Sequence, residues 1–343
     1  MSRTIYYIGA GASRGKRDDK GNILEGVPVV SEIPNEFAAF REFINNAVVP
    51  DGYTTFLGLY HTSANDVQNC KLMMLSDIDR LQQGILEHAT IDTYARKLYL
   101  TNCFTEFKTL KDILCSFFVW SQLEHKVDGR YDTFFANILD ERTLALPSDI
   151  SIISWNYDSQ IESAYKAYRN NPGLPIFEKN IQGEWPSLPK SGRVFKINGT
   201  ASFLDGSVVE RIKESESKTV AAVQLILFYN SSRADTSSMG FQMRTHLSFA
   251  WEPAVNHDKL MNALAVTTAD AEQVVVIGYS FPFFNREMDR AILKGMPKLQ
   301  KIYIQDIDAS MVLQSIKAVL PDDRSVEIVL IDKCNQFYLP SEL

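Results

Sequence analysis

The sequence predicts an α/β fold: a Rossmann-like parallel sheet with helices on both faces and an inserted helical module. Short, strongly apolar runs alternate with segments of helical periodicity, which is typical of a parallel sheet buried on both sides. Polar or glycine-rich motifs directly follow several of these runs. Because ligands bind beyond the carboxyl ends of parallel strands, these motifs are the candidate site residues.

The first apolar run, Ile5–Ile8, predicts a buried strand. It breaks into the glycine-rich turn Gly9–Ser13. Glycine permits positive φ and has no Cβ, so the backbone amides of such a turn can face a phosphate. Arg14 replaces the third glycine of the pattern G-x-G-x-x-G, so the dinucleotide fingerprint of a dehydrogenase is incomplete.

The next part of the chain is predicted to be mainly helical. Pro34–Val49 presents apolar residues on one face, with Asn35 in position to cap the helix. Residues 77–139 repeat apolar and aromatic side chains at helical spacing, which is typical of helices packed against one another. We therefore expect a nucleotide-binding domain of residues 1–50 and 147–343 and an inserted helical module of residues 51–146.

The second half of the chain carries the remaining strands. Strands are expected at Ile150–Ser154, Val194–Ile197, Val274–Ile277, Lys301–Ile304 and Val326–Ile331. Helices are expected at Gln160–Arg169, Asp258–Ala265, Asn285–Leu293 and Ser310–Val319. The pattern leaves the fold of residues 206–256 open, with one further strand candidate at Val223–Phe228.

Composition limits the classes of function. The 343 residues carry a net charge of −7, which argues against a broad nucleic-acid-binding surface and favours a small-molecule or protein partner. Cys70, Cys103, Cys115 and Cys334 form no C-x-x-C pair, so neither a zinc ribbon nor a disulfide framework is expected. No apolar run reaches the ~18 residues of a membrane span, and the first strand begins too early for a signal peptide. These observations favour a cytoplasmic location without membrane attachment.

Four motifs stand at predicted strand ends. In chain order they are Gly9–Ser13, Trp155–Asp158, Lys196–Gly199 and Gly278–Pro282. Together they resemble the sirtuin family, and specifically the sirtuin-like NAD-consuming domains of bacterial antiphage defence proteins, over about residues 4–310. The helical segment between the first two motifs is similar to the family layout. Gly26-Val27-Pro28 is similar to the Gly-x-Pro element that the family carries over the nicotinamide side.

The resemblance implies that NAD is the ligand, and it assigns roles on the nicotinamide side. It implies that Asn156 hydrogen-bonds the ribose and places a water at the anomeric carbon. It implies that Asp158 steadies this region or contacts the nicotinamide amide, and that Pro28 lies nearby. Such roles suit glycosidic cleavage, which needs a positioned nucleophile and an oxocarbenium-like transition state. Alternatively, Asp158 or Ser159 only caps the following helix.

The resemblance also implies the residues that hold the rest of the nucleotide. They are Gly9, Ala10, Gly11 and Ser13 along the pyrophosphate, Gly278 and Ser280 at the adenosine-side phosphate and ribose, Asp306 or Asp308 at the adenosine ribose hydroxyls, and Gly199 in the third motif. Simpler alternatives are a strand-end turn at Gly278, solvent-facing carboxylates at Asp306 and Asp308, and an ordinary turn at Asn198-Gly199.

One departure from the family concerns the third motif. Its histidine, which acts as a base toward a ribose hydroxyl, is replaced by Asn198, which takes no proton near neutral pH. Three interpretations follow. Hydrolysis runs without the base, since loss of a general base often costs ~10²–10⁴-fold rather than everything; or His246 or His257 takes its place; or the site binds a nucleotide without cleaving it.

The absence of a four-cysteine zinc module disfavours a protein deacylase. The resemblance implies an NAD glycohydrolase that cleaves NAD to nicotinamide and ADP-ribose, needs no metal, and acts as an antiphage or abortive-infection effector kept off until triggered. It also implies a homo-oligomer, a partner protein of the same defence system, or both. The net charge and the length of the apolar runs predict no direct nucleic-acid or membrane binding. The alternative is a non-catalytic NAD or ADP-ribose sensor, or a regulatory subunit of a defence complex.

Overall fold

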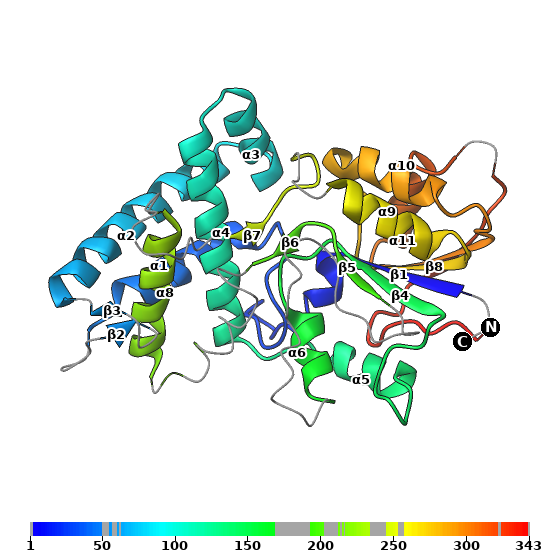
Figure 1. The fold of residues 1–343 in the computed structure, drawn as a ribbon, viewed down its shortest axis with the longest axis horizontal. Helices are drawn as coiled ribbons and strands as arrows, with labels where there is room; N and C mark the ends of the chain where they lie inside the picture. Colours follow the sequence, from blue (N-terminus) through cyan, green and yellow to red (C-terminus); the bar gives the residue numbers. More distant parts are fainter. Residues whose placement is uncertain are drawn as a thin grey trace. The chain divides into compact units, whose positions relative to one another are not determined.

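The computed structural model describes residues 3–49, 55–56, 60–61, 63–168, 193–201, 212, 215, 217–233, 245–252, 257–321 and 324–341 (Figure 1). The chain divides into two compact units. The first unit comprises Met1–Gly26, Val127–Gly199 and Ser248–Leu343, and the second comprises Val27–Lys126 and Thr200–Leu247.

A six-stranded, all-parallel sheet forms the centre of the first unit. Its strands are β1 (Arg3–Ile8), β4 (Ile150–Ser154), β5 (Val194–Lys196), β8 (Ala271–Ile277), β9 (Lys301–Gln305) and β10 (Glu327–Ile331), in the order β10-β9-β8-β1-β4-β5. The chain proceeds outward from β1 to β5 and then returns to β8, on the other side of β1. This is the doubly wound order of a Rossmann-like sheet, with the switch point between β1 and β8. The predicted fold class is therefore confirmed.

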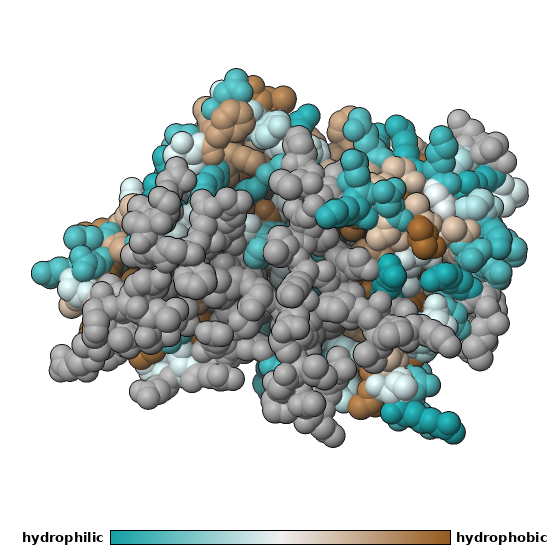
Figure 2. Space-filling model, in the orientation of Figure 1, coloured by the Kyte–Doolittle hydropathy of each residue, from teal (hydrophilic) through white to brown (hydrophobic). Residues whose placement is uncertain are grey.

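Helices cover both faces of the sheet because its central strands are apolar on both sides. Ile5 and Tyr7 of β1 pack with α9 (His257–Thr268), α10 (Arg286–Lys294) and α11 (Ala309–Lys317). Tyr6 and Ile8 point to the opposite face and pack with α5 (Gly129–Ile138) and α6 (Gln160–Lys166). Over α10, Figure 2 shows mainly hydrophilic residues, as expected for a helix whose apolar side faces a sheet.

The register of the sheet aligns the ends of the three strands that precede the first, second and fourth motifs. Ile8 at the end of β1 pairs with Ser154 at the end of β4 and with Ile277 at the end of β8. Each strand is then followed directly by its motif, which begins at Gly9, Trp155 or Gly278. The motifs therefore leave the sheet side by side at its carboxyl edge.

The second unit is mainly helical. Its helices are α1 (Ile33–Asn45), α2 (Ala64–Leu86), α3 (Ile91–Leu100), α4 (Phe104–Glu124) and α8 (Lys218–Arg233), together with the hairpin of β2 (Thr55–Phe56) and β3 (Tyr60–His61). Ser63 begins α2 through a capping box with Asp66. Phe37 stacks on Phe117 with a centroid distance of 5.0 Å, so aromatic packing joins α1 to α4 as the periodicity predicts.

The strand candidate Val223–Phe228 is wrong, because these residues lie within α8. A short apolar run has the same composition in a buried helix as in a buried strand, and α8 is buried along most of its length. Tyr229 in the same helix donates a hydrogen bond of 2.7 Å to the buried Asp77 of α2. Tertiary contacts therefore fix a helix here.

Two further expectations differ from the structure. The helix α1 begins at Ile33 after the N-cap Glu32, so Asn35 lies inside the helix rather than at its cap. The unit boundaries also differ from the predicted domains, since α1 and residues 200–247 belong to the second unit and α5 to the first. Two short strands, β6 (Gly199–Thr200) and β7 (His246–Leu247), form a separate two-stranded sheet. In the described segments, no helix is long and apolar enough to cross a membrane.

Candidate functional site

Ser13 is the centre of a buried hydrogen-bond cluster beyond the end of β1. It lies at the end of the short 3-10 helix η1 (Ala10–Ser13). Its Oγ atom is 2.9 Å from the Asn156 Nδ2 atom, 3.1 Å from the Asp158 Oδ1 atom and 2.9 Å from the Tyr131 hydroxyl. The structure therefore joins the first and second motifs through Ser13, Asn156 and Asp158, which the sequence predicted as site residues.

The hydroxyl of Ser13 is fully used within this cluster. A serine hydroxyl has one proton to donate and two lone pairs that accept. Its proton goes to Asp158, which is an acceptor when ionised, and the two lone pairs accept from the Asn156 amide and the Tyr131 hydroxyl. Ser13 consequently holds other side chains in place and has no hydrogen-bonding capacity left for a phosphate.

Asn156 has one side-chain atom to spare. The bond from its Nδ2 atom to Ser13 fixes the orientation of the amide, so the Oδ1 atom points elsewhere. No described residue donates a hydrogen bond to that oxygen. Asn156 is thus a neutral acceptor held rigidly at the carboxyl end of β4, as a residue that positions water or a hydroxyl must be.

Asp158 combines two of the predicted roles. Its Oδ1 atom accepts from the Ser13 hydroxyl and, at 2.9 Å, from the backbone amide of Gln160, the first residue of α6. The second bond satisfies an amide of the first turn of α6, as the capping alternative requires, although the N-cap residue itself is Ser159. Burial raises the pKa of the Asp158 carboxyl, and the positive charge of Lys196 opposes that rise.

Lys196 is a buried cation of the third motif, for which the sequence predicted no individual role. Its Nζ atom donates a 2.5 Å hydrogen bond to the backbone carbonyl of Asp158 and lies 3.4 Å from the Oε1 atom of Glu162. Burial also raises the pKa of Glu162, again against the charge of Lys196. A lysine within a short apolar strand indicates a buried ion pair, because a buried charge needs a partner. This was the feature of the sequence that could have revealed the role of Lys196.

Asn198 lies beside the second motif and leaves one buried acceptor unsatisfied. Its Nδ2 atom donates to the backbone carbonyl of Trp155 at 2.9 Å, and its own carbonyl accepts from the amide of Ser248 at 3.0 Å. The side chain is nearly inaccessible, with 6% of the residue exposed, and no described residue donates to its Oδ1 atom. A buried acceptor without a donor costs about 1–3 kcal/mol, so this oxygen suits a donor from a ligand or a water.

The two glycine turns interlock at the switch point between β1 and β8. Gly278 has φ of +59°, and a Cβ there would lie 2.4 Å from the Ala12 nitrogen. A Cβ on Gly11 would lie 2.8 Å from the Gly278 Cα. The amides of Gly9 and Gly11 donate to the carbonyls of Ile277 and Gly278. These two amides, which the resemblance places along a pyrophosphate, thus hold the turns together, whereas the Ala10 amide donates to no described residue.

Arg130 anchors the same turn from α5, a role that the sequence pattern did not predict. Its guanidinium donates to the carbonyls of Gly11 and Ala12 at 3.0 and 3.2 Å and pairs with Asp128 at 2.6 Å. It also donates to the carbonyl of Cys334 at 3.1 Å. Both carbonyls of the turn therefore accept a hydrogen bond from the same guanidinium. The local sequence offers little to predict this role, because it shows a single arginine beside the aromatic face of a helix.

The remaining predicted residues have different environments. Asp308 caps α11 by accepting from the Met311 amide at 3.2 Å, and it is exposed. Asp306 accepts from the Asp308 amide at 2.9 Å and is half-buried, so it remains the better acceptor for a hydroxyl at the end of β9. Ser280 is exposed after β8. The capping of Asp308 supports the structural alternative for that residue.

No hydrogen bond between the last predicted residues and the Ser13 cluster is seen among the described residues. Gly199 has φ of +69° where β6 begins, as an ordinary turn glycine has. Pro28 is buried and belongs to the second unit. His246 is half-buried in β7, and the side chain of His257 lies outside the described residues. The described part of the chain contains no group of three or more His, Cys, Asp or Glu side chains that could hold a metal ion.

The site is thus a rigid, acceptor-rich cluster at the carboxyl ends of β1, β4 and β5, next to a pair of interlocked glycine turns. The chain matches no protein-family model and no curated protein.

Proposed function

We propose that this protein is an NAD glycohydrolase. In the proposed reaction water adds to the anomeric carbon of the nicotinamide ribose, and the carbon–nitrogen bond breaks with its electron pair leaving on nicotinamide. The products are nicotinamide, ADP-ribose and one proton. The observation that carries the proposal is the junction of Ser13, Asn156 and Asp158, which joins two motifs at the ligand-binding edge of a doubly wound sheet.

The hydrogen-bond acceptors of the cluster are suited to binding the ribose and nicotinamide end of NAD. Asn156 and Asn198 each offer an amide oxygen, and Asp158 offers a carboxylate, so the cluster accepts hydrogen bonds and repels phosphate. Ribose hydroxyls and the carboxamide NH₂ are the donors that NAD provides. The negative charge of Asp158 also stabilises the positive charge that develops on the ribose during cleavage.

Asn198 supports a reaction that depends on positioning. Its Oδ1 atom accepts a hydrogen bond from a ribose hydroxyl but does not remove the proton. A site with an asparagine at this position therefore turns over more slowly than one with a base, by the ~10²–10⁴-fold that general bases contribute. The same residue favours the second candidate function, a sensor that binds NAD or ADP-ribose without cleaving it.

An NAD-consuming enzyme harms the cell that makes it, so the activity must be restrained. We propose that self-association or a partner protein of the same antiphage defence system provides that restraint. Purified protein should therefore be assayed alone and together with whatever co-purifies.

The test is NAD turnover followed by mass spectrometry, with Asn156→Ala as the site variant. Asn137→Ala is the matched control, because Asn137 is an exposed asparagine on α5 whose amide donates to the Thr133 carbonyl of the same helix. Nicotinamide and ADP-ribose from the parent and from Asn137→Ala, but not from Asn156→Ala, support the hydrolase. Saturable NAD binding without turnover, weakened by Asn156→Ala alone, supports the sensor. Neither binding nor turnover contradicts both.

A further inference from the structure

Asp289 of α10 is a completely buried carboxyl without a basic partner among the described residues. Its Oδ1 atom accepts a 2.6 Å hydrogen bond from the Tyr7 hydroxyl of β1. Its Oδ2 atom accepts one of 3.1 Å from the hydroxyl of Tyr279, in the turn after β8. One carboxyl therefore holds side chains from both sides of the switch point.

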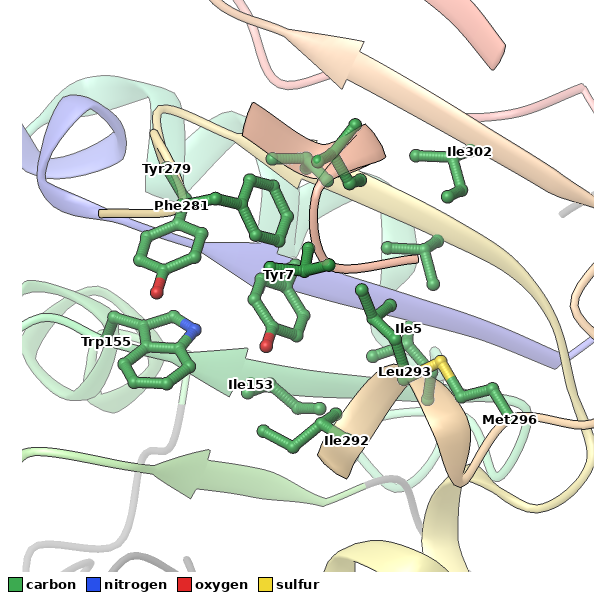
Figure 3. Close-up of a cluster of buried hydrophobic side chains, with 14 of the residues drawn as sticks. Ile5, Tyr7, Ile153, Trp155, Tyr279, Phe281, Ile292, Leu293, Met296 and Ile302 are labelled. Atoms are coloured by element: carbon green, nitrogen blue, oxygen red, sulfur yellow. The ribbon is translucent and has the colours of Figure 1, made fainter. Parts of the chain in front are cut away.

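The rings of these tyrosines connect Asp289 to the site. Tyr279 stacks on Trp155 with a centroid distance of 5.0 Å and an interplanar angle of 10°, and Tyr7 lies 6.0 Å from the same indole. Figure 3 shows Tyr7, Trp155 and Tyr279 gathered where the strands end. The carbonyl of Trp155 accepts from Asn198, and Asn156 is the next residue in the chain. The indole thus links the carboxyl to both asparagines of the site.

Backbone strain marks the same cluster. Phe281 has φ of +52°, which is rare for a bulky side chain. Its buried ring stacks on Tyr7 with a centroid distance of 5.6 Å and an interplanar angle of 13°. The strained backbone therefore places this ring inside the aromatic cluster. Such strain persists only where the surroundings fix it, and it concentrates at functional sites.

We propose that the Asp289 carboxyl is a positioning residue that holds Trp155, and through it Asn156 and Asn198, by fixing the hydroxyls of Tyr7 and Tyr279. The effect on turnover rests on the proposed function. The coupling between the carboxyl and the indole does not.

The charge of Asp289 makes this coupling sensitive to pH. Burial raises the pKa of the carboxyl to about 7, while the hydrogen bonds from Tyr7 and Tyr279 oppose the rise. The groups that face it are those two hydroxyls, and Asn285 donates to the Tyr279 hydroxyl at 3.0 Å. The ionised carboxyl accepts from both tyrosines, whereas the protonated one must itself donate and so competes with them. The indole environment should therefore change near neutral pH.

The experiment follows the fluorescence of Trp155 from pH 5.5 to 8.5, taken as the difference between each protein and its Trp155→Phe counterpart. Asp289→Asn is the test variant, because its amide oxygen still accepts hydrogen bonds and preserves the fold. Glu287→Gln is the matched control, since Glu287 is an exposed carboxylate on the same helix. We expect a transition with a midpoint near pH 7 in the parent and in Glu287→Gln, and none in Asp289→Asn.

Asp289→Leu, checked for folding by circular dichroism, removes the acceptor altogether. We expect at least a tenfold fall in kcat with a smaller change in KM, and partial rescue in Asp289→Asn. A transition that persists in Asp289→Asn, or is absent from the parent, overturns the proposal. If the transition follows Asp289 but no variant turns over NAD, the positioning role stands and the hydrolase proposal fails.

Discussion

The side-chain amide of Asn156 donates a 2.9 Å hydrogen bond to the hydroxyl of Ser13, which lies 143 positions away in the sequence. Each residue follows a different central strand, and neighbouring parallel strands place their carboxyl ends at one edge. The bond gives the asparagine a single orientation and leaves its oxygen for another molecule. It also makes the geometry of the site depend on a residue that need not touch a ligand.

Ser13→Ala should therefore damage both stability and activity. The substitution leaves the Asn156 amide, the Asp158 carboxylate and the Tyr131 hydroxyl without their shared partner in a buried place. We expect a loss of about 1–3 kcal/mol in the free energy of unfolding, measured by urea denaturation, and loss of NAD turnover. Ser310→Ala, at an exposed position of α11, should change neither. Unchanged unfolding of Ser13→Ala would contradict the shared-partner role.

The interlocked turns lead to a second prediction, on stability. Gly278→Ala places a Cβ 2.4 Å from the Ala12 nitrogen and forces φ of +59° on an alanine. Gly21 also has positive φ, +85°, but nothing lies within 4 Å of its Cβ position. Gly21→Ala should cost about 1–2 kcal/mol from backbone conformation alone. Gly278→Ala should cost clearly more in the same thermal melts, and equal costs would show that the turns can separate freely.

Asn198→His restores the type of base that the resemblance leads one to expect. If water attack is limited by the missing base, turnover should rise by ~10-fold or more. The rate should increase as pH rises through the ordinary histidine pKa of ~6.5, because only the neutral imidazole accepts a proton. Asn198→Leu is the control that removes the acceptor, and it should abolish turnover. A rate profile of Asn198→His that is flat between pH 5.5 and 7.5 would argue against a base at this position.

Asp289 should make the folded state less stable as pH rises from about 4 to 7. Its pKa is about 7 in the folded protein and 3.8 in its ordinary state, so the folded chain binds the additional proton in this range. Stability then falls with increasing pH, by up to about 1.4 kcal/mol per pH unit. Asp289→Asn should remove this contribution, so its stability relative to the parent should be higher at pH 8 than at pH 5. Parallel stability profiles for the two proteins would show that Asp289 is ionised throughout.

The sequence was sufficient to predict the parallel sheet and the position of the motifs at its edge. A strand that is buried on both faces is a continuous apolar run, which can be recognised without knowledge of its neighbours. Ile5–Ile8 and Ile150–Ser154 are examples. The same signal fails at Val223–Phe228, where a helix buries an equally apolar run. The contacts of Tyr131, Arg130 and Lys196 escaped prediction because these partners are distant in sequence. Only the folded chain brings the Ser13 hydroxyl to Tyr131 and backbone carbonyls to Arg130 and Lys196.

The place of β1 in the sheet has a consequence for biosynthesis. The first strand of the sheet gains its second neighbour with β8, whose residues Ala271–Ile277 are synthesised some hundred and twenty positions after β4. Gly278 then packs against the Gly9–Ser13 turn, which Arg130 and Asn156 also hold. A chain still emerging from the ribosome therefore carries the first three motifs before the contacts from β8 and Gly278 can form. If the protein hydrolyses NAD, as proposed, its site would therefore lack part of its support until translation of the domain is nearly finished.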